Sequence, residues 1–194
     1  MKKFFRKIVI GAIWVYYKIV HRYSVEGQEN IPREGAVIFC GNHRSNLDPP
    51  LMKITAKRET HFLAKESLFK NPFLGALGKL FGEIPVTKDA KDLNAIKTSL
   101  KYLKNGECIA LFPEGTRNGL AKGKKVKDGA AFFAVRTKAT VIPVGITGTM
   151  KPFCKLKIKY GKPLDFSNYN KNDAEALDEV TDIIMKKILE LVEY

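Results

Sequence analysis

The sequence predicts a single α/β domain in which helices flank a mixed, largely parallel sheet, preceded by an N-terminal helical segment that associates with a membrane. The sheet is predicted because apolar runs of strand length alternate with helical patterns along the chain. One domain is predicted because 194 residues, 45% of them hydrophobic, can bury one substantial core. No linker or internal repeat divides the chain, so we expect a basic anchor over residues 1–24 and a globular domain over residues 25–194.

The first half of the globular domain combines apolar strands with two helices. A connection over residues 25–35, interrupted by proline and glycine, leads to a buried strand over 36–40. Asp48–Pro49 is typical of a helix N-cap followed by proline at the first helical position, so a helix should run from Pro49 towards Lys57. Further expected elements are a strand over 61–64, a helix beginning at Asn71–Pro72 within the apolar stretch 68–81, and a short extended piece over 84–86.

The second half continues the alternation. Buried strands are expected over 108–112 and 141–146, and helices over 92–104 and 129–137. Residues 155–160 alternate apolar and charged side chains, the pattern of an edge or half-exposed strand. The last segment, 173–192, is an amphipathic helix whose apolar stripe predicts packing on the core.

The formal charge of +14 indicates an anionic partner, which leaves nucleic acid, an anionic lipid surface or a phosphorylated substrate. The alternative is that the lysines only keep the protein soluble. Three widely spaced cysteines, Cys40, Cys108 and Cys154, have neither disulfide nor metal-site spacing, so a reducing cytoplasmic environment is expected.

The N-terminal segment narrows the choice of partner. Residues 1–24 carry six basic side chains and no acidic one, on both sides of the ten-residue apolar run Ile8–Tyr17. Ten helical residues cover about 15 Å, roughly half of the hydrocarbon thickness, so a membrane span is not expected. No small-residue cleavage site follows, which argues against a secretory signal. An interfacial anchor on anionic lipid is favoured, and the alternative is a helix packed on the core.

The stretch Gly41–Asp48 carries the first candidate site. His43 leaves the strand 36–40 and precedes Asp48 by five positions. A carboxylate that hydrogen-bonds one imidazole nitrogen fixes the tautomer and leaves the other nitrogen free to accept a proton. The alternative is that Asp48 only caps the following helix and that His43 is an ordinary turn residue. The two roles are compatible, because capping would hold Asp48 near His43.

A second candidate site follows the strand 108–112. Phe112–Arg117, with the sequence Phe-Pro-Glu-Gly-Thr-Arg, presents a carboxylate, a hydroxyl and a guanidinium within four residues. Arg117 is suited to binding a phosphate or carboxylate through two hydrogen bonds. The alternative is a polar turn with an exposed ion pair.

Other chemistries fit less well. The sequence has no Gly-x-Ser-x-Gly nucleophile motif. The stretch 119–125 resembles a phosphate-binding loop, but its glycines are one residue too close and no Ser or Thr follows the lysine. The three histidines, His21, His43 and His61, lie far apart in the sequence and give only weak support for a metal site. No cofactor is expected.

Together, Asn42–His43-x4-Asp48 and Phe112–Arg117 resemble the paired signature of the glycerolipid acyltransferases, and within them the bacterial 1-acyl-sn-glycerol-3-phosphate acyltransferases. Two weaker blocks, 82–88 and 141–144, agree in order and spacing. The segment 64–68 resembles the one that supplies a phosphate-binding lysine, and 126–129 also fits the pattern. The resemblance spans about Gly35–Gly148. Lys88 departs from it, because the family commonly has Arg there, and the N-terminal segment is shorter than in many relatives.

The resemblance implies a function and a set of roles. His43, oriented by Asp48, would take the proton from the sn-2 hydroxyl of lysophosphatidate, which then attacks an acyl thioester of coenzyme A or acyl carrier protein. Backbone amides would stabilise the oxyanion. The substrate-binding residues implied are Lys65, Lys88, Glu114, Gly115, Thr116 and Arg117.

The implied partners are lysophosphatidate, the acyl thioester, an anionic membrane surface at the cytoplasmic face of the cell membrane and, for one donor, acyl carrier protein. Nucleic acid is not expected. Acylation of glycerol-3-phosphate or of another lysophospholipid remains the alternative within the family. A basic surface-binding module without catalysis remains the alternative outside it.

Overall fold

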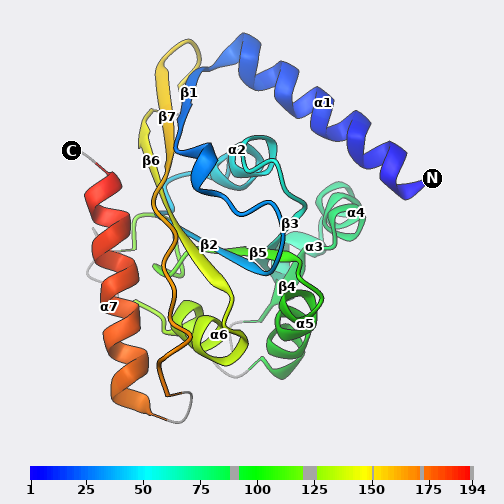
Figure 1. The fold of residues 1–194 in the computed structure, drawn as a ribbon. Helices are drawn as coiled ribbons and strands as arrows, with labels where there is room; N and C mark the ends of the chain where they lie inside the picture. The colour runs from blue at the N-terminus through cyan, green and yellow to red at the C-terminus, as the bar shows by residue number, and fades with distance from the viewer. Residues whose placement is uncertain (88–91, 120–125, 150, 171–172, 193–194) are drawn as a thin grey trace.

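The computed structural model describes residues 1–87, 92–119, 126–149, 151–170 and 173–192, which form an α/β fold. Within these residues seven strands make one sheet in the order β1-β7-β6-β2-β5-β3-β4 (Figure 1). The strands are β1 (Arg22–Glu26), β2 (Val37–Gly41), β3 (Thr60–Lys65), β4 (Ile84–Val86), β5 (Cys108–Leu111), β6 (Thr140–Gly148) and β7 (Lys155–Tyr160). The helices are α1 (Lys2–Val20), α2 (Asp48–Thr55), α3 (Glu66–Phe69), α4 (Pro72–Phe81), α5 (Leu93–Lys104), α6 (Gly129–Thr137) and α7 (Ala174–Leu191), with a 3-10 turn, η1 (Gln28–Asn30).

The sheet is mixed and largely parallel, as predicted. Strands β6, β2, β5, β3 and β4 are parallel to one another, β7 is antiparallel to β6, and β1 pairs with β7 in parallel. Five neighbouring strands therefore end at the same edge of the sheet. In open α/β sheets this carboxyl edge is where ligands bind, because the loops that follow the strands converge there.

The core lies on both faces of the sheet because the central strand β2 is buried along its whole length. Ile38 and Cys40 pack towards α5, α6 and α7, whereas Val37 and Phe39 pack towards α2 and the Tyr17 side chain of α1. This alternation is the period of two that a strand imposes on its side chains. The continuous apolar run of β2 therefore indicates a strand covered on both faces.

The sheet contains one strand that the sequence did not predict, at its edge. Residues 22–26 form a strand, β1, which the polar and charged sequence did not suggest. Strand β7 is half-exposed, one of the two predicted alternatives, and it lies inside the sheet because β1 pairs with it. The last three residues of the expected anchor, 22–24, thus belong to the sheet.

Helix α1 crosses above α2 and projects from the body of the protein (Figure 1). Tyr17 is its buried residue, and the Tyr17 hydroxyl donates to the Leu47 carbonyl at the start of α2. Near the other end, Arg6 donates to the Leu80 carbonyl of α4 and pairs with Glu59. Across the described part of the chain, no helix combines the length and the apolarity that crossing a membrane requires.

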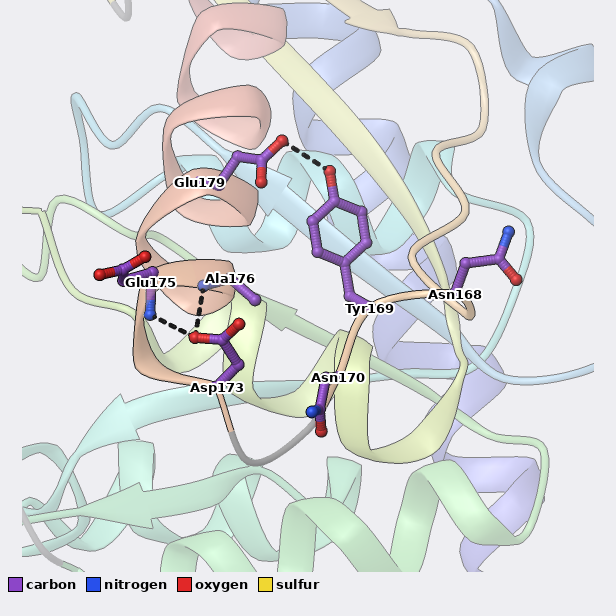
Figure 2. Close-up of a pocket in the computed structure, with 7 residues that line it drawn as sticks. All are labelled: Asn168, Tyr169, Asn170, Asp173, Glu175, Ala176 and Glu179. Atoms are coloured by element: carbon purple, nitrogen blue, oxygen red, sulfur yellow. Dashed lines mark hydrogen bonds between the residues drawn. The ribbon is translucent and has the colours of Figure 1, made fainter.

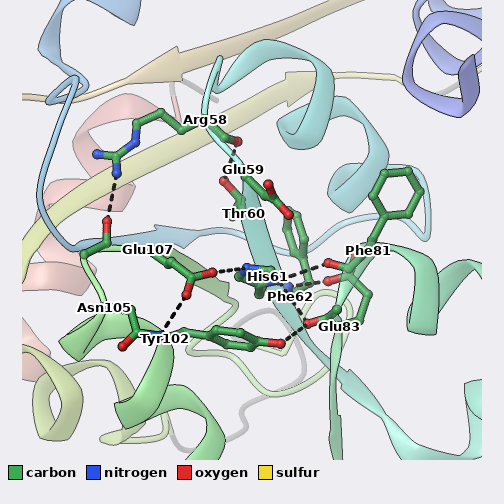
Figure 3. A network of polar contacts seen from close by, with 12 residues as sticks. Arg58, Glu59, Thr60, His61, Phe62, Phe81, Glu83, Tyr102, Asn105 and Glu107 are labelled. Carbon is green, nitrogen blue, oxygen red and sulfur yellow. Dashed lines mark hydrogen bonds and ion pairs between the residues drawn. The ribbon is translucent and has the colours of Figure 1, made fainter. Parts of the chain in front are cut away.

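A buried polar network ties the amino end of β3 to α4 and α5 (Figure 3). The His61 ring stacks on Tyr102 with 3.9 Å between the ring centroids. Its Nε2 atom lies 3.1 Å from Glu107 Oε2, and its Nδ1 atom lies 3.0 Å from the carbonyl oxygens of Phe81 and Gly82. His61 therefore has a structural environment, at the end of the strands opposite the carboxyl edge.

Candidate active site

The turn after β2 brings His43 and Asp48 together. His43 Nδ1 lies 2.9 Å from Asp48 Oδ2, and Asp48 is completely buried. The same Oδ2 atom accepts hydrogen bonds of 2.7 Å from the backbone amides of Arg44 and Ser45. An ionised carboxylate can only accept, so Nδ1 carries the proton and Nε2 is left to exchange one with a substrate.

The expected capping role of Asp48 is wrong in detail. Leu47 is the N-cap of α2, and Asp48 is the first residue of the helix. The Asp48 carboxylate turns back to the amides that precede it and does not cap those of the first helical turn. Asp48 therefore closes the loop that carries His43 and orients the imidazole.

The His43 ring is held on its other side by the loop after β5. It stacks on Phe112 with 4.2 Å between centroids and 14° between ring planes. Its side chain is 18% exposed, so part of the ring still reaches the surface. The His43 ring is therefore held in place but remains accessible to a substrate.

The loop after β5 lies beside the His43 turn because β2 and β5 are parallel neighbours, with Cys40 opposite Leu111. Glu114 Oε1 accepts from the His43 backbone amide at 3.0 Å, and the Asn118 amide donates to the His43 carbonyl at 2.7 Å. The two sequence motifs are thus joined through the backbone of His43.

The other expected site residues lie along the same edge. Gly115 has a φ of 64°, which favours glycine, and a Cβ atom there would lie 3.0 Å from Cε of Lys127. Thr116 is half-buried and Arg117 is exposed. Lys65 is exposed at the carboxyl end of β3, opposite Val86 of β4. Lys88 lies outside the described residues.

Asn42 contributes to the site but was not among the expected site residues. Its side-chain amide donates to the Ile146 carbonyl at 2.9 Å, and its carbonyl oxygen accepts from the Ile146 amide at 2.7 Å. Through these two hydrogen bonds the Asn42 side chain extends the pairing of β2 with β6 by one residue, and it fixes the chain just before His43. The signal in the sequence was a polar amide that directly follows a buried apolar strand.

The hollows on the described surface include two with different linings. One borders the site and is lined by Arg44, Ser45, Asn118, Ile146, Gly148, Thr149 and Leu156. The other lies at the start of α7 and is lined by Asn168, Tyr169, Asn170, Asp173, Glu175, Ala176 and Glu179 (Figure 2). The second hollow contains no residue of the two motifs, and its carboxylates would repel an anionic substrate.

Among the residues that the structure describes, no group of three His, Cys, Asp or Glu side chains is placed to hold a metal ion.

Residues 22–147 match the acyltransferase family, and the chain belongs to it. The protein is an acyltransferase, the class of enzyme that its two motifs resemble.

Several relatives are similar over most of the chain. The 1-acyl-sn-glycerol-3-phosphate acyltransferase of Bacillus subtilis is 27% identical over 192 residues, which cover 95% of this chain and 96% of the relative. That of Streptococcus pneumoniae is 27% identical over 98% of this chain and 72% of its own length. The crystal structure of the 1-acyl-sn-glycerophosphate (LPA) acyltransferase PlsC from Thermotoga maritima superposes with a TM-score of 0.73 at 28% identity, covering 98% of this chain and 83% of that one.

Proposed function

We propose that this acyltransferase transfers an acyl chain from an acyl thioester to the sn-2 hydroxyl of lysophosphatidate, which produces phosphatidate for phospholipid synthesis. The observation that carries the proposal is the buried Asp48 carboxylate on Nδ1 of His43, which leaves Nε2 for a substrate hydroxyl. The names of the relatives from Bacillus subtilis and Streptococcus pneumoniae support this acceptor.

In the proposed reaction, His43 Nε2 removes the proton of the acceptor hydroxyl as its oxygen attacks the thioester carbonyl. The negative charge that develops on the carbonyl oxygen is stabilised by backbone amides. When the tetrahedral intermediate collapses, the carbon–sulfur bond breaks and the His43 imidazolium returns the proton to the leaving thiolate. Asp48 stabilises the imidazolium through Nδ1. No covalent acyl-enzyme and no metal or other cofactor takes part.

The acceptor phosphate is proposed to bind at the carboxyl edge, on the β5 and β3 side of His43. Arg117 and Lys65 supply its positive charge, with Lys88 as a third contact, and Gly115 and Thr116 shape the pocket. The positions of Arg117 and Lys65 support this assignment, because they follow or end two neighbouring parallel strands. An arginine can hold a phosphate through two hydrogen bonds, which also orients the glycerol hydroxyl.

Helix α1 is proposed to attach the enzyme to an anionic membrane at the cytoplasmic face, without crossing it. Phe4, Ile8, Val15 and Ile19 recur at steps of four and seven residues and are all exposed, so they form one apolar face. Exposed lysines lie beside this face, namely Lys3, Lys7 and Lys18. An apolar face beside lysines fits the boundary between lipid headgroups and acyl chains.

The test is an acyl-transfer assay with purified protein, a labelled acyl thioester and two acceptors in parallel. We expect labelled phosphatidate from lysophosphatidate and little product from glycerol-3-phosphate. The donor is supplied in separate reactions as acyl-coenzyme A and as acyl carrier protein thioester. Efficient acylation of glycerol-3-phosphate with none of lysophosphatidate would contradict the proposed acceptor.

A further inference from the structure

We infer that Glu114 is a positioning residue that acts through the backbone of His43, and that it does not contact the acceptor lipid. This inference rests on the proposed function, because it assigns Glu114 a role in the same site. Its position in the Phe112–Arg117 motif suggested a substrate contact, whereas its contacts in the folded chain suggest otherwise.

Glu114 is buried against His43. It is 6% exposed, and its Oε1 atom accepts from the His43 amide at 3.0 Å. A hydrogen bond to a carboxylate is stronger than one between neutral groups, so this contact strongly restrains the peptide it reaches. A carboxylate that is buried and turned to a protein amide is poorly placed to meet a ligand in solvent.

The same loop holds the second polar backbone atom of His43. The Asn118 amide donates to the His43 carbonyl at 2.7 Å, and Phe112 stacks on the His43 ring. One loop therefore holds both the backbone and the ring of His43, and this fixes the direction in which Nε2 points. Misplacing a catalytic group by about 1 Å costs on the order of 100-fold in rate, so a restraint of this kind is catalytically important.

Gly119 shows that the loop closes tightly over Glu114. A Cβ atom at Gly119 would lie 2.9 Å from Cβ of Glu114 and 2.7 Å from its carbonyl oxygen, and Gly119 is itself buried. No side chain fits between these two residues, and neither does a substrate group. The Gly119 amide also donates to the Thr116 carbonyl at 3.2 Å, which closes the turn. Glycine at 119 thus allows the loop to hold Glu114 in place.

The experiment compares Glu114→Ala, Glu114→Gln and Gly119→Ala in steady-state acyl transfer with varied lysophosphatidate. Glu114→Ala should lower kcat about 100-fold and change the KM for lysophosphatidate less than about threefold. Glu114→Gln retains an oxygen that can accept from the His43 amide, so it should recover most of kcat. Gly119→Ala should lower kcat because it displaces Glu114. Glu179→Ala, which removes a glutamate hydrogen-bonded to Tyr169, is the control and should behave as wild type.

An increase of tenfold or more in KM with kcat unchanged in Glu114→Ala would overturn the inference, as would a Glu114→Gln variant no better than alanine. Thermal unfolding of each variant is measured in parallel. If the alanine variant does not fold, Gly119→Ala decides by the same kcat and KM criteria, and a loss of tenfold or more in kcat in Glu114→Gln would also overturn the inference. A wild-type enzyme inactive on lysophosphatidate refutes only the proposed acceptor. The comparison is then made with the acceptor that the wild type does use.

Discussion

His43 Nδ1 lies 2.9 Å from Asp48 Oδ2, and that same oxygen accepts the backbone amides of Arg44 and Ser45. The carboxylate therefore folds the turn and orients the imidazole at once. Because the backbone amides hold Asp48 in place, the orientation of His43 does not depend on a flexible carboxylate.

Replacement of His43 by alanine should reduce acyl transfer by at least about 1,000-fold, because the general base is lost. The fold should remain, since the His43 side chain is partly exposed and Asp48 keeps its two backbone donors. A labelled-thioester assay and a thermal unfolding curve together check both parts. Near-normal activity in a folded variant would disprove the role of His43.

Two substitutions at Asp48 should separate orientation from folding. Asp48→Asn keeps an oxygen for the turn amides but loses the negative charge, so kcat should fall by about 100-fold or more with little change in stability. Asp48→Ala also leaves the Arg44 and Ser45 amides without their acceptor, which should lower the free energy of unfolding by about 2 kcal/mol. Urea unfolding and kcat are measured on both variants. Equal stability of the two variants would show that Asp48 does not hold the turn.

Arg117→Ala should raise the KM for lysophosphatidate at least about tenfold and leave the KM for the acyl donor nearly unchanged, because the acceptor phosphate loses a charged partner and the acyl donor does not. Arg117→Lys should restore part of the affinity for lysophosphatidate, since an ammonium keeps the positive charge but cannot make the bidentate hydrogen bonds of a guanidinium. Arg33→Ala, at an exposed arginine before β2, is the control. Equal effects on both substrates would count against a phosphate contact.

Ile8→Ser with Ile19→Ser should weaken binding to anionic vesicles by about 100-fold, because two side chains that are 51% and 68% exposed would no longer enter the lipid. These positions avoid Tyr17, whose removal would disturb α2. The control is Leu93→Ser with Leu189→Ser, at side chains that are 63% and 44% exposed on α5 and α7. Binding is measured by co-sedimentation with vesicles. If both double variants bind equally well, α1 is not the anchor.

The Lys53–Glu83 ion pair lies away from the site, and loss of one partner should lower the stability of the fold. The two groups lie 2.8 Å apart, and burial raises the pKa of Glu83 and lowers that of Lys53. Lys53→Met leaves Glu83 buried without its cation and should cost about 3 kcal/mol of unfolding free energy. Adding Glu83→Gln should recover most of that loss. The free energies of unfolding are measured in urea. If the losses from the two substitutions simply add in the double variant, Lys53 and Glu83 are not coupled.

Several parts of the fold could be predicted because they are encoded locally. The apolar run 36–40 indicated a buried strand, and the stripe through Val180 and Ile184 indicated the packed helix α7. Strand β1 could not be predicted in this way. Its residues alternate between exposed and half-exposed, and it exists through pairing with β7, about 130 residues further along the chain.

The sequence by itself determined the chemistry available to this protein, because the side chains of His43, Asp48, Glu114 and Arg117 and their spacing are local properties. It also determined the alternation of strands and helices. Only the tertiary structure decided which of these residues meet. The parallel register of β2 and β5 sets the Glu114 carboxylate against the His43 amide, and the folded turn directs Asp48 to His43 in place of a helix cap. Such contacts depend on non-local backbone pairing, which residue type and spacing alone do not specify.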